Sequence, residues 1–149
     1  MIILLIATSN AFGWLLAYLK VPALVSSSIY GLSKNPYIIL LMINILLLAL
    51  GTLMDMSPII LIATPILLPI AKSIGVDPVQ FGTLLILNLG VGLLTPPVGA
   101  TLFLGSAISG IKFEKLAVSM KYVYLIMAIV LMMVTFIPQI SLFLPSFVN

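Results

Sequence analysis

The sequence contains no cysteine and no histidine among its 149 residues. Without them the chain cannot form disulfides, thiolate nucleophiles or imidazole bases, and it lacks the usual ligands of zinc, copper, haem and iron–sulfur centres. Charged residues are also scarce, at 6% of the composition against about 25% in an ordinary soluble domain. These absences argue against an enzyme, against a nucleic-acid-binding surface and against a soluble fold.

Hydrophobic residues make up 63% of the chain and gather in long runs. We predict an all-α integral membrane protein, because a helix of about 20 apolar residues crosses the hydrocarbon layer. The lysines lie near the ends of these runs, where lysines anchor helices and set topology. No lysine precedes the first run, unlike the charge order of a signal peptide, so we interpret this run as a retained membrane helix.

Prolines and glycines divide the chain into segments of one predicted membrane domain, 1–149. The segments are a membrane helix at 1–19, a re-entrant hairpin at 37–72, a discontinuous helix at 79–110 and a last membrane helix at 122–138. A polar connection from Lys20 to Pro36 is expected between the first two. The second arm of the hairpin, 59–72, is expected to be too short to cross the bilayer.

The lysines indicate which ends of these segments share a membrane face. A hairpin returns to its own side, so two groups are expected: Lys20, Lys34 and Lys72 on one face, and Lys112, Lys115 and Lys121 on the other. The second group lies within one short loop, which favours that face as the cytoplasmic one.

Residues 95–99, with the sequence TPPVG, interrupt an apolar run of transmembrane length. Two prolines in succession remove two backbone donors and end the helix, and Gly99 can adopt whatever backbone angles the break requires. In a bilayer such a break is tolerated only where it is buried in protein or lines a cavity. Secondary transporters build ion and substrate sites in this way. The alternative is a proline kink that only shapes helix packing.

Asp55 is the only acid far from a predicted membrane edge, at the tip of the hairpin. Intramembrane carboxylates are costly and usually functional, but Asp55 could equally cap the second arm, which we expect to begin with Ser57 as N-cap and Pro58 at its first position. If the tip and the break meet near the midplane, their main-chain oxygens could replace the water shell of a sodium ion.

Three further polar residues have structural interpretations. Asn44 is expected to form a hydrogen bond between helices, whereas Asn88 is assigned equally to such a bond or to support of the site. Thr64 is expected to satisfy the carbonyl that Pro65 leaves without a donor.

Three groups of residues together resemble a known family. Residues 51–58 read GTLMDMSP and are followed by TPILLP at 64–69, residues 88–99 read NLGVGLLTPPVG, and residues 136–145 read FIPQISLFLP. Similar patterns, with threonine in place of Ser57, are found in the C-terminal third of the large membrane subunit of TRAP (tripartite ATP-independent periplasmic) transporters. The chain is similar to this family over nearly its whole length.

The resemblance implies half of an inverted-repeat elevator transporter, the permease of a sodium-coupled importer of organic acids such as C4-dicarboxylates or sialic acid. The implied partners are the small TRAP membrane subunit, an extracytoplasmic substrate-binding protein, the remaining N-terminal half of the large subunit and the lipid bilayer of the bacterial inner membrane. Sodium is the implied coupling ion, with ligands from Gly51, Asp55, Gly92, Thr95 and Gly99. The implied substrate contacts come from Ser57, Pro58, Thr95, Pro96 and Pro97.

The chain departs from the family in one respect. The family's large subunit contains two hairpins and two broken helices, and this sequence contains one of each, so we expect a truncated or split subunit or a fragment of a longer frame. A small re-entrant-loop channel is the alternative function and predicts ion conductance without a coupling gradient. An intramembrane aspartyl protease needs two facing aspartates, and Asp77 is expected in a turn at the membrane edge, away from Asp55.

Overall fold

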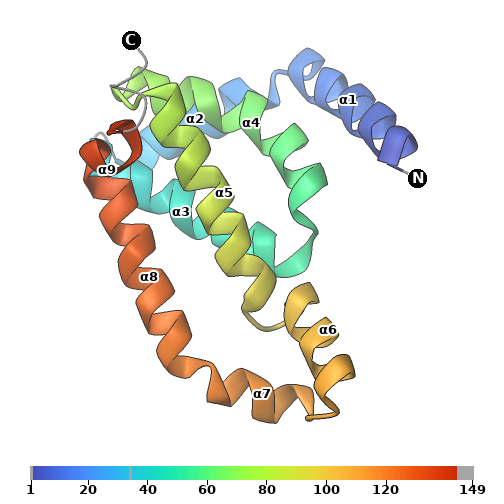
Figure 1. The fold of residues 1–149 in the computed structure, drawn as a ribbon. Coiled ribbons are helices and arrows are strands. Elements are labelled where there is room, and N and C mark those ends of the chain that lie inside the picture. Colours follow the sequence, from blue (N-terminus) through green and yellow to red (C-terminus); the bar gives the residue numbers. More distant parts are fainter. Residues whose placement is uncertain (1, 34, 144–149) are drawn as a thin grey trace.

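The computed structural model describes residues 2–33 and 35–143, and every regular element within these stretches is an α-helix (Figure 1). The helices are α1 (Ile2–Tyr18), α2 (Val21–Leu32), α3 (Pro36–Leu53), α4 (Met56–Ser73), α5 (Pro78–Leu94), α6 (Ala100–Ser109), α7 (Phe113–Ser119), α8 (Lys121–Phe136) and α9 (Pro138–Leu142). The predicted all-α fold is therefore confirmed. Met1, Lys34 and the end of the predicted terminal motif at Leu144 and Pro145 lie outside the described residues.

The centre of the molecule is the pair formed by α3 and α5 (Figure 1). Ile39, Ile43 and Leu47 of α3 are 0% exposed and recur every four residues, so they form one face of the helix. Leu84 and Leu89 of α5 are equally buried. Lipid is as apolar as these side chains, so close van der Waals packing holds the two helices together more than the hydrophobic effect does.

The predicted hairpin is present as α3 and α4, but its second arm is longer than expected. Helix α4 begins at Met56, contains Pro65 and Pro69, and is 18 residues long, as is α3. Each proline removes only one backbone hydrogen bond, and neither ends the helix here. Both arms are therefore long and apolar enough to cross a membrane, and the expected short arm at 59–72 is wrong.

The expected polar connection between Lys20 and Pro36 is also wrong, because most of it is helix α2. The Ser27 and Ser28 hydroxyls both donate to the Leu24 carbonyl, at 2.8 and 2.9 Å. A serine run can therefore remain helical where its side chains bond to the preceding turn. Between α1 and α2 the chain bends by 63° at Lys20, whose φ of 54° is left-handed.

The last predicted membrane helix, 122–138, is found as α8, at Lys121–Phe136. It ends earlier than expected because Pro138 opens the short helix α9. Helix α7 precedes α8 with a bend of 55°. In Figure 1, α7 crosses the end of the molecule opposite α9 and joins α6 to α8.

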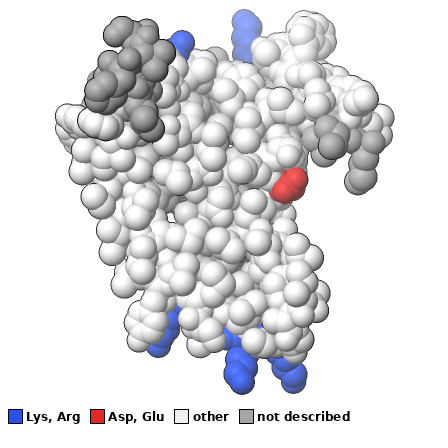
Figure 2. Space-filling model, in the orientation of Figure 1, with Lys and Arg blue, Asp and Glu red and all other residues white. Residues whose placement is uncertain are grey.

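The described lysines divide between the two ends of the molecule, as the sequence predicts. Lys20 lies at the corner between α1 and α2, and Lys72 lies in the last turn of α4. The second group lies on or beside α7: Lys112, Lys115 and Lys121. Figure 2 shows blue groups at both ends of the visible face and none between them. In Figure 1, α8 runs between these two ends, and α5 and α6 together cover the same length, as in a protein that spans a bilayer.

The left-handed backbone at Lys20 generates a prediction. A residue with a Cβ atom is strained in this conformation, whereas glycine is not. We expect Lys20→Gly to raise the free energy of unfolding by up to about 1 kcal/mol, measured by thermal unfolding in detergent. Lys72→Gly, inside α4, is the matched control and should lower stability by about 0.5–1 kcal/mol. Equal effects of the two substitutions would contradict the assignment of strain.

Candidate functional site

The tip of the hairpin consists of two extended residues between α3 and α4. Met54 donates its backbone N–H to the Leu50 carbonyl at 3.0 Å, and Asp55 then occupies the N-cap position of α4 with φ −67° and ψ 153°. The Asp55 carboxylate makes no capping hydrogen bond. Ser57 lies inside α4, so the expected N-cap at Ser57 is wrong. Asp55 is the N-cap residue, although its side chain makes no capping hydrogen bond.

The predicted helix break is present between α5 and α6. Thr95 is extended, at φ −100° and ψ 133°, the peptide bond between Pro96 and Pro97 is cis, and Gly99 is left-handed at φ 53°. The Thr95 N–H donates to the Gly92 carbonyl at 2.9 Å, and the Thr95 hydroxyl donates to the Val91 carbonyl at 2.6 Å. Pro97 has no N–H for the Leu93 carbonyl four residues before it. The end of α5 therefore presents main-chain oxygen at the break.

The tip and the break lie next to each other because Gly51 and Gly92 are in backbone contact. A Cβ atom added to Gly92 would lie 2.7 Å from the Gly51 Cα and 2.6 Å from its carbonyl carbon. One added to Gly51 would lie 3.2 Å from the Leu89 Cα. Glycine is needed at Gly92 because any side chain there would overlap the backbone of α3. The pair occupies the last turns of both helices, so the carboxyl ends of α3 and α5 meet.

Some predicted site residues are buried at this contact, and others are not covered by the chain. Gly51, Gly92 and Gly99 are buried, and Thr95 and Pro58 are half-buried. The remaining four are exposed: Asp55, Ser57, Pro96 and Pro97. The structure thus brings Gly51 and Gly92 together. It leaves the carboxylate and both prolines facing outward, available to a ligand or to another chain.

The described residues contain no group of three or more histidine, cysteine, aspartate or glutamate side chains that could hold a metal ion. Main-chain oxygens, the Thr95 hydroxyl and the single carboxylate of Asp55 are the possible ligand atoms in this region. Hard cations such as sodium accept them, and helix carboxyl ends carry partial negative charge. The junction of α3 and α5 therefore suits a hard cation better than a transition metal.

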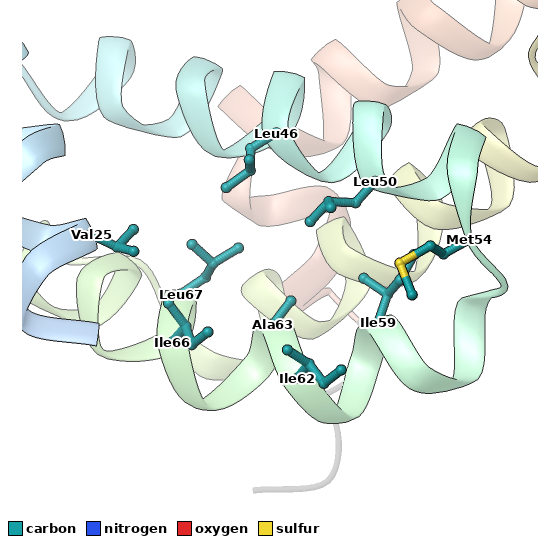
Figure 3. A pocket seen from close by; sticks show the side chains of 9 residues that line it. All are labelled: Val25, Leu46, Leu50, Met54, Ile59, Ile62, Ala63, Ile66 and Leu67. Atoms are coloured by element: carbon teal, nitrogen blue, oxygen red, sulfur yellow. The ribbon is translucent and has the colours of Figure 1, made fainter. Parts of the chain in front are cut away.

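The cavity between the arms of the hairpin has the wrong chemistry for an organic anion. It encloses about 160 Å³ between α2, α3 and α4. Figure 3 shows that its lining is entirely hydrocarbon and thioether: Val25, Leu46, Leu50, Met54, Ile59, Ile62, Ala63, Ile66 and Leu67. An anion there would have no donor to replace its water. A substrate site inside the hairpin is therefore unsupported.

A buried polar cluster joins α3, α5 and α8, and sequence reasoning found only half of it. The Asn88 amide donates to the Asn44 side-chain oxygen and to the Leu84 carbonyl. Asn44 donates in turn to the Thr135 hydroxyl at 3.1 Å, and Gln80 donates to the Thr135 carbonyl at 3.1 Å. Asn44 forms the expected bond between helices, and so does Asn88. Thr135 and Gln80 gave no sequence signal, because only the fold brings α8 to α5.

Thr64 does not take the role expected for it. Its buried hydroxyl oxygen has no hydrogen-bond partner in the part of the chain that the structure describes. The expected bond to the carbonyl freed by Pro65 is therefore absent. That carbonyl, of Leu61, instead points toward α1, where it lies 4.0 Å from the position that a Cβ atom on Gly13 would occupy.

Comparison with known families identifies the chain's relatives. Residues 1–140 match the family described as tripartite ATP-independent periplasmic transporter, DctM component. The chain belongs to the DctM family. The predicted family is therefore confirmed. Because family members are transporter components and not enzymes, the prediction that the chain is not an enzyme is confirmed as well. Its composition and apolar helices make this DctM chain a multi-pass membrane protein.

Individual relatives show how much of a DctM protein this chain represents. An uncharacterized protein, YgiK, of Salmonella typhimurium is 43% identical over 97% of this chain and 33% of its own length. The sialic acid TRAP transporter large permease protein SiaM of Vibrio cholerae is 38% identical over 96% of this chain and 34% of its own length. The C4-dicarboxylate TRAP transporter large permease protein DctM of Pseudomonas aeruginosa is 36% identical over 100% of this chain and 35% of its own length. The chain spans about a third of these relatives.

The glycine contact generates a prediction about stability. Gly92→Ala places a methyl group against the Gly51 backbone, so α3 and α5 must separate. We expect a loss of about 1–3 kcal/mol in the free energy of unfolding, measured by thermal unfolding in detergent. Gly90→Ala is the matched control, because nothing lies within 4 Å of its added Cβ atom. It should gain up to about 1 kcal/mol from helix propensity, and similar losses in both variants would refute the contact.

The polar cluster generates a second prediction. Replacing Asn44 and Asn88 by leucine, singly and together, should give a coupling energy near 0.6 kcal/mol and no more than about 1.7 kcal/mol, the range measured between membrane helices. The measurement is a double-mutant cycle on thermal unfolding. Asn10, which is exposed on α1, replaces Asn88 in a control cycle. A coupling energy near zero for Asn44 and Asn88 would contradict the bond.

Proposed function

We propose that this chain is part of the permease of a secondary transporter that imports organic acids with sodium as the coupling ion. The observation that carries the proposal is the meeting of the hairpin tip with the helix break at Gly51 and Gly92. Broken helices of this kind hold substrates and ions in secondary transporters. The names of two relatives, for sialic acid and for C4-dicarboxylates, support an organic acid as the substrate.

Helix polarity supports separate places for the cation and the anion. The carboxyl ends of α3 and α5 carry partial negative charge and adjoin at the glycine contact, which favours sodium near Gly51, Gly92 and Thr95. The amino ends of α4 and α6 carry partial positive charge. Ser57 and Pro58 lie in the first turn of α4, and Gly99 directly precedes α6. An organic carboxylate is therefore favoured near the first turn of α4 and near Pro96 and Pro97.

The wider transport cycle extends the same proposal. The hairpin of α3 and α4 would be re-entrant, and the chain would supply one hairpin and one broken helix of an inverted-repeat elevator. The second pair would come from the remaining half of the large subunit. A small membrane subunit and an extracytoplasmic substrate-binding protein would complete the system in the bacterial inner membrane.

Two substitutions test the sodium site. With the chain joined to the rest of a large subunit, Asp55→Asn removes the carboxylate charge and Thr95→Ala removes the hydroxyl at the break. We expect each to raise the sodium concentration needed for half-maximal substrate uptake into proteoliposomes by about tenfold or more, the ratio that corresponds to 1.4 kcal/mol.

Asp77→Asn and Thr83→Ala are the matched controls. Asp77 caps α5 at the other end of that helix, where its carboxylate accepts from the Val79 N–H at 2.7 Å. The Thr83 hydroxyl donates to the Val79 carbonyl within α5, at 2.9 Å. Unchanged sodium dependence in both site variants would refute the sodium site. Ion conductance without a coupling gradient would favour the alternative, a small re-entrant-loop channel or pore component.

A further inference from the structure

The cavity between the arms of the hairpin reaches into the interior of the protein. It encloses about 160 Å³, and three of its lining residues, Ile59, Ala63 and Leu67, are only 4%, 5% and 2% exposed. Figure 3 shows Leu50 pointing from α3 and Leu67 pointing from α4 into the space between the arms, with Val25 of α2 at one end. A molecule in this space would therefore contact three helices at once.

The cavity remains open because one residue of its lining is small. Ala63 lies near the middle of α4, and the other eight lining residues are valine, leucine, isoleucine or methionine. Ile59 and Leu67 lie one turn before and one turn after Ala63, on the same face of the helix. The alanine between these two large side chains leaves a hollow, as happens when a core leucine is shortened to alanine.

The lining selects a small apolar ligand by its chemistry and its size. No lining side chain carries nitrogen or oxygen, so a water molecule there would lack the polar side chains that hold buried water. An engineered protein cavity of about 150 Å³, lined by leucine, isoleucine and phenylalanine, stays dry and binds benzene or xenon. Ordinary ligand sites begin at about 300 Å³. A phospholipid or a peptide helix is therefore too large for this cavity, whereas a molecule of the size of benzene fits.

We propose that the cavity within the hairpin binds one small apolar molecule of about the size of benzene. The molecule would lie between α3 and α4 and contact Met54 and Ile59, which lie on either side of the tip at Asp55. Because it would fill the space between the arms, it would oppose any movement of one arm toward the other. Neither Gly51 nor Gly92 lines the cavity, and the proposal does not depend on the sodium site or on transport.

Methionine methyl groups provide the test, because Met54 lines the cavity. The chain is labelled with carbon-13 at its methionine methyl groups, placed in deuterated detergent and titrated with benzene, and Met54→Leu assigns the resonance. We expect the aromatic ring to shift the Met54 methyl resonance along a saturable curve. Met132 and Met133 of α8 lie outside the cavity lining and are 37% and 47% exposed, so they report benzene dissolved in the detergent. Equal shifts without saturation at all three methionines would overturn the proposal.

Filling the cavity should remove the binding. Ala63→Leu adds side-chain volume from α4 and Val25→Phe adds it from α2, so that one variant remains informative if the other does not fold. We expect each to weaken benzene binding about ten-fold or more. Ala128→Leu, at an exposed position of α8 outside the cavity lining, is the control and should leave the binding unchanged.

Circular dichroism verifies that the three variants remain helical. Saturable binding of unchanged affinity in a folded cavity-filling variant would contradict the assignment to this cavity. If neither filling variant folds, the titration of Met54 in the unaltered chain decides, because a saturable shift confined to this methionine supports the proposal and its absence refutes it.

Discussion

The backbone contact between Gly51 and Gly92 is the constraint on which the rest of the arrangement depends. Each glycine lies two residues before the end of its helix, at Leu53 and at Leu94. Their contact therefore places the two helix carboxyl ends, the hairpin tip and the helix break in one region. A Cβ atom at Gly92 would meet main-chain atoms and not a flexible side chain. The helices would have to move apart to accommodate it.

The buried polar cluster is a second contact between α3 and α5. Asn44 meets Asn88, and further along each helix Gly51 meets Gly92. Two ordered contacts of this kind show that α3 and α5 run in the same direction, because α4, which follows α3 along the chain, returns the chain to the starting end. Thr135 extends the cluster to α8, so α8 is held to the pair of helices that forms the candidate site.

The sequence predicted those features that depend on local backbone chemistry. Two prolines and a glycine at 96–99 end one helix and begin another wherever the segment lies, and the turn at Asp55 separates two apolar runs. The errors arose where local signals were ambiguous. The serines of α2 bond to the preceding turn and remain helical, and α4 continues through Pro65 and Pro69. Asp55 takes the N-cap position expected for Ser57, because the helix begins earlier than the Ser-Pro pair suggests.

The sequence by itself determined that this chain lies in a membrane, where its hairpin turns and α5 ends, and which family it belongs to, since all three follow from composition and from residues close together along the chain. Only the tertiary structure decided which helix ends lie in contact with each other. The contacts of Gly51 with Gly92 and of Asn44 with Thr135 join residues far apart in sequence, and nothing local to glycine, asparagine or threonine specifies a partner. Those pairings follow from the direction and crossing of whole helices.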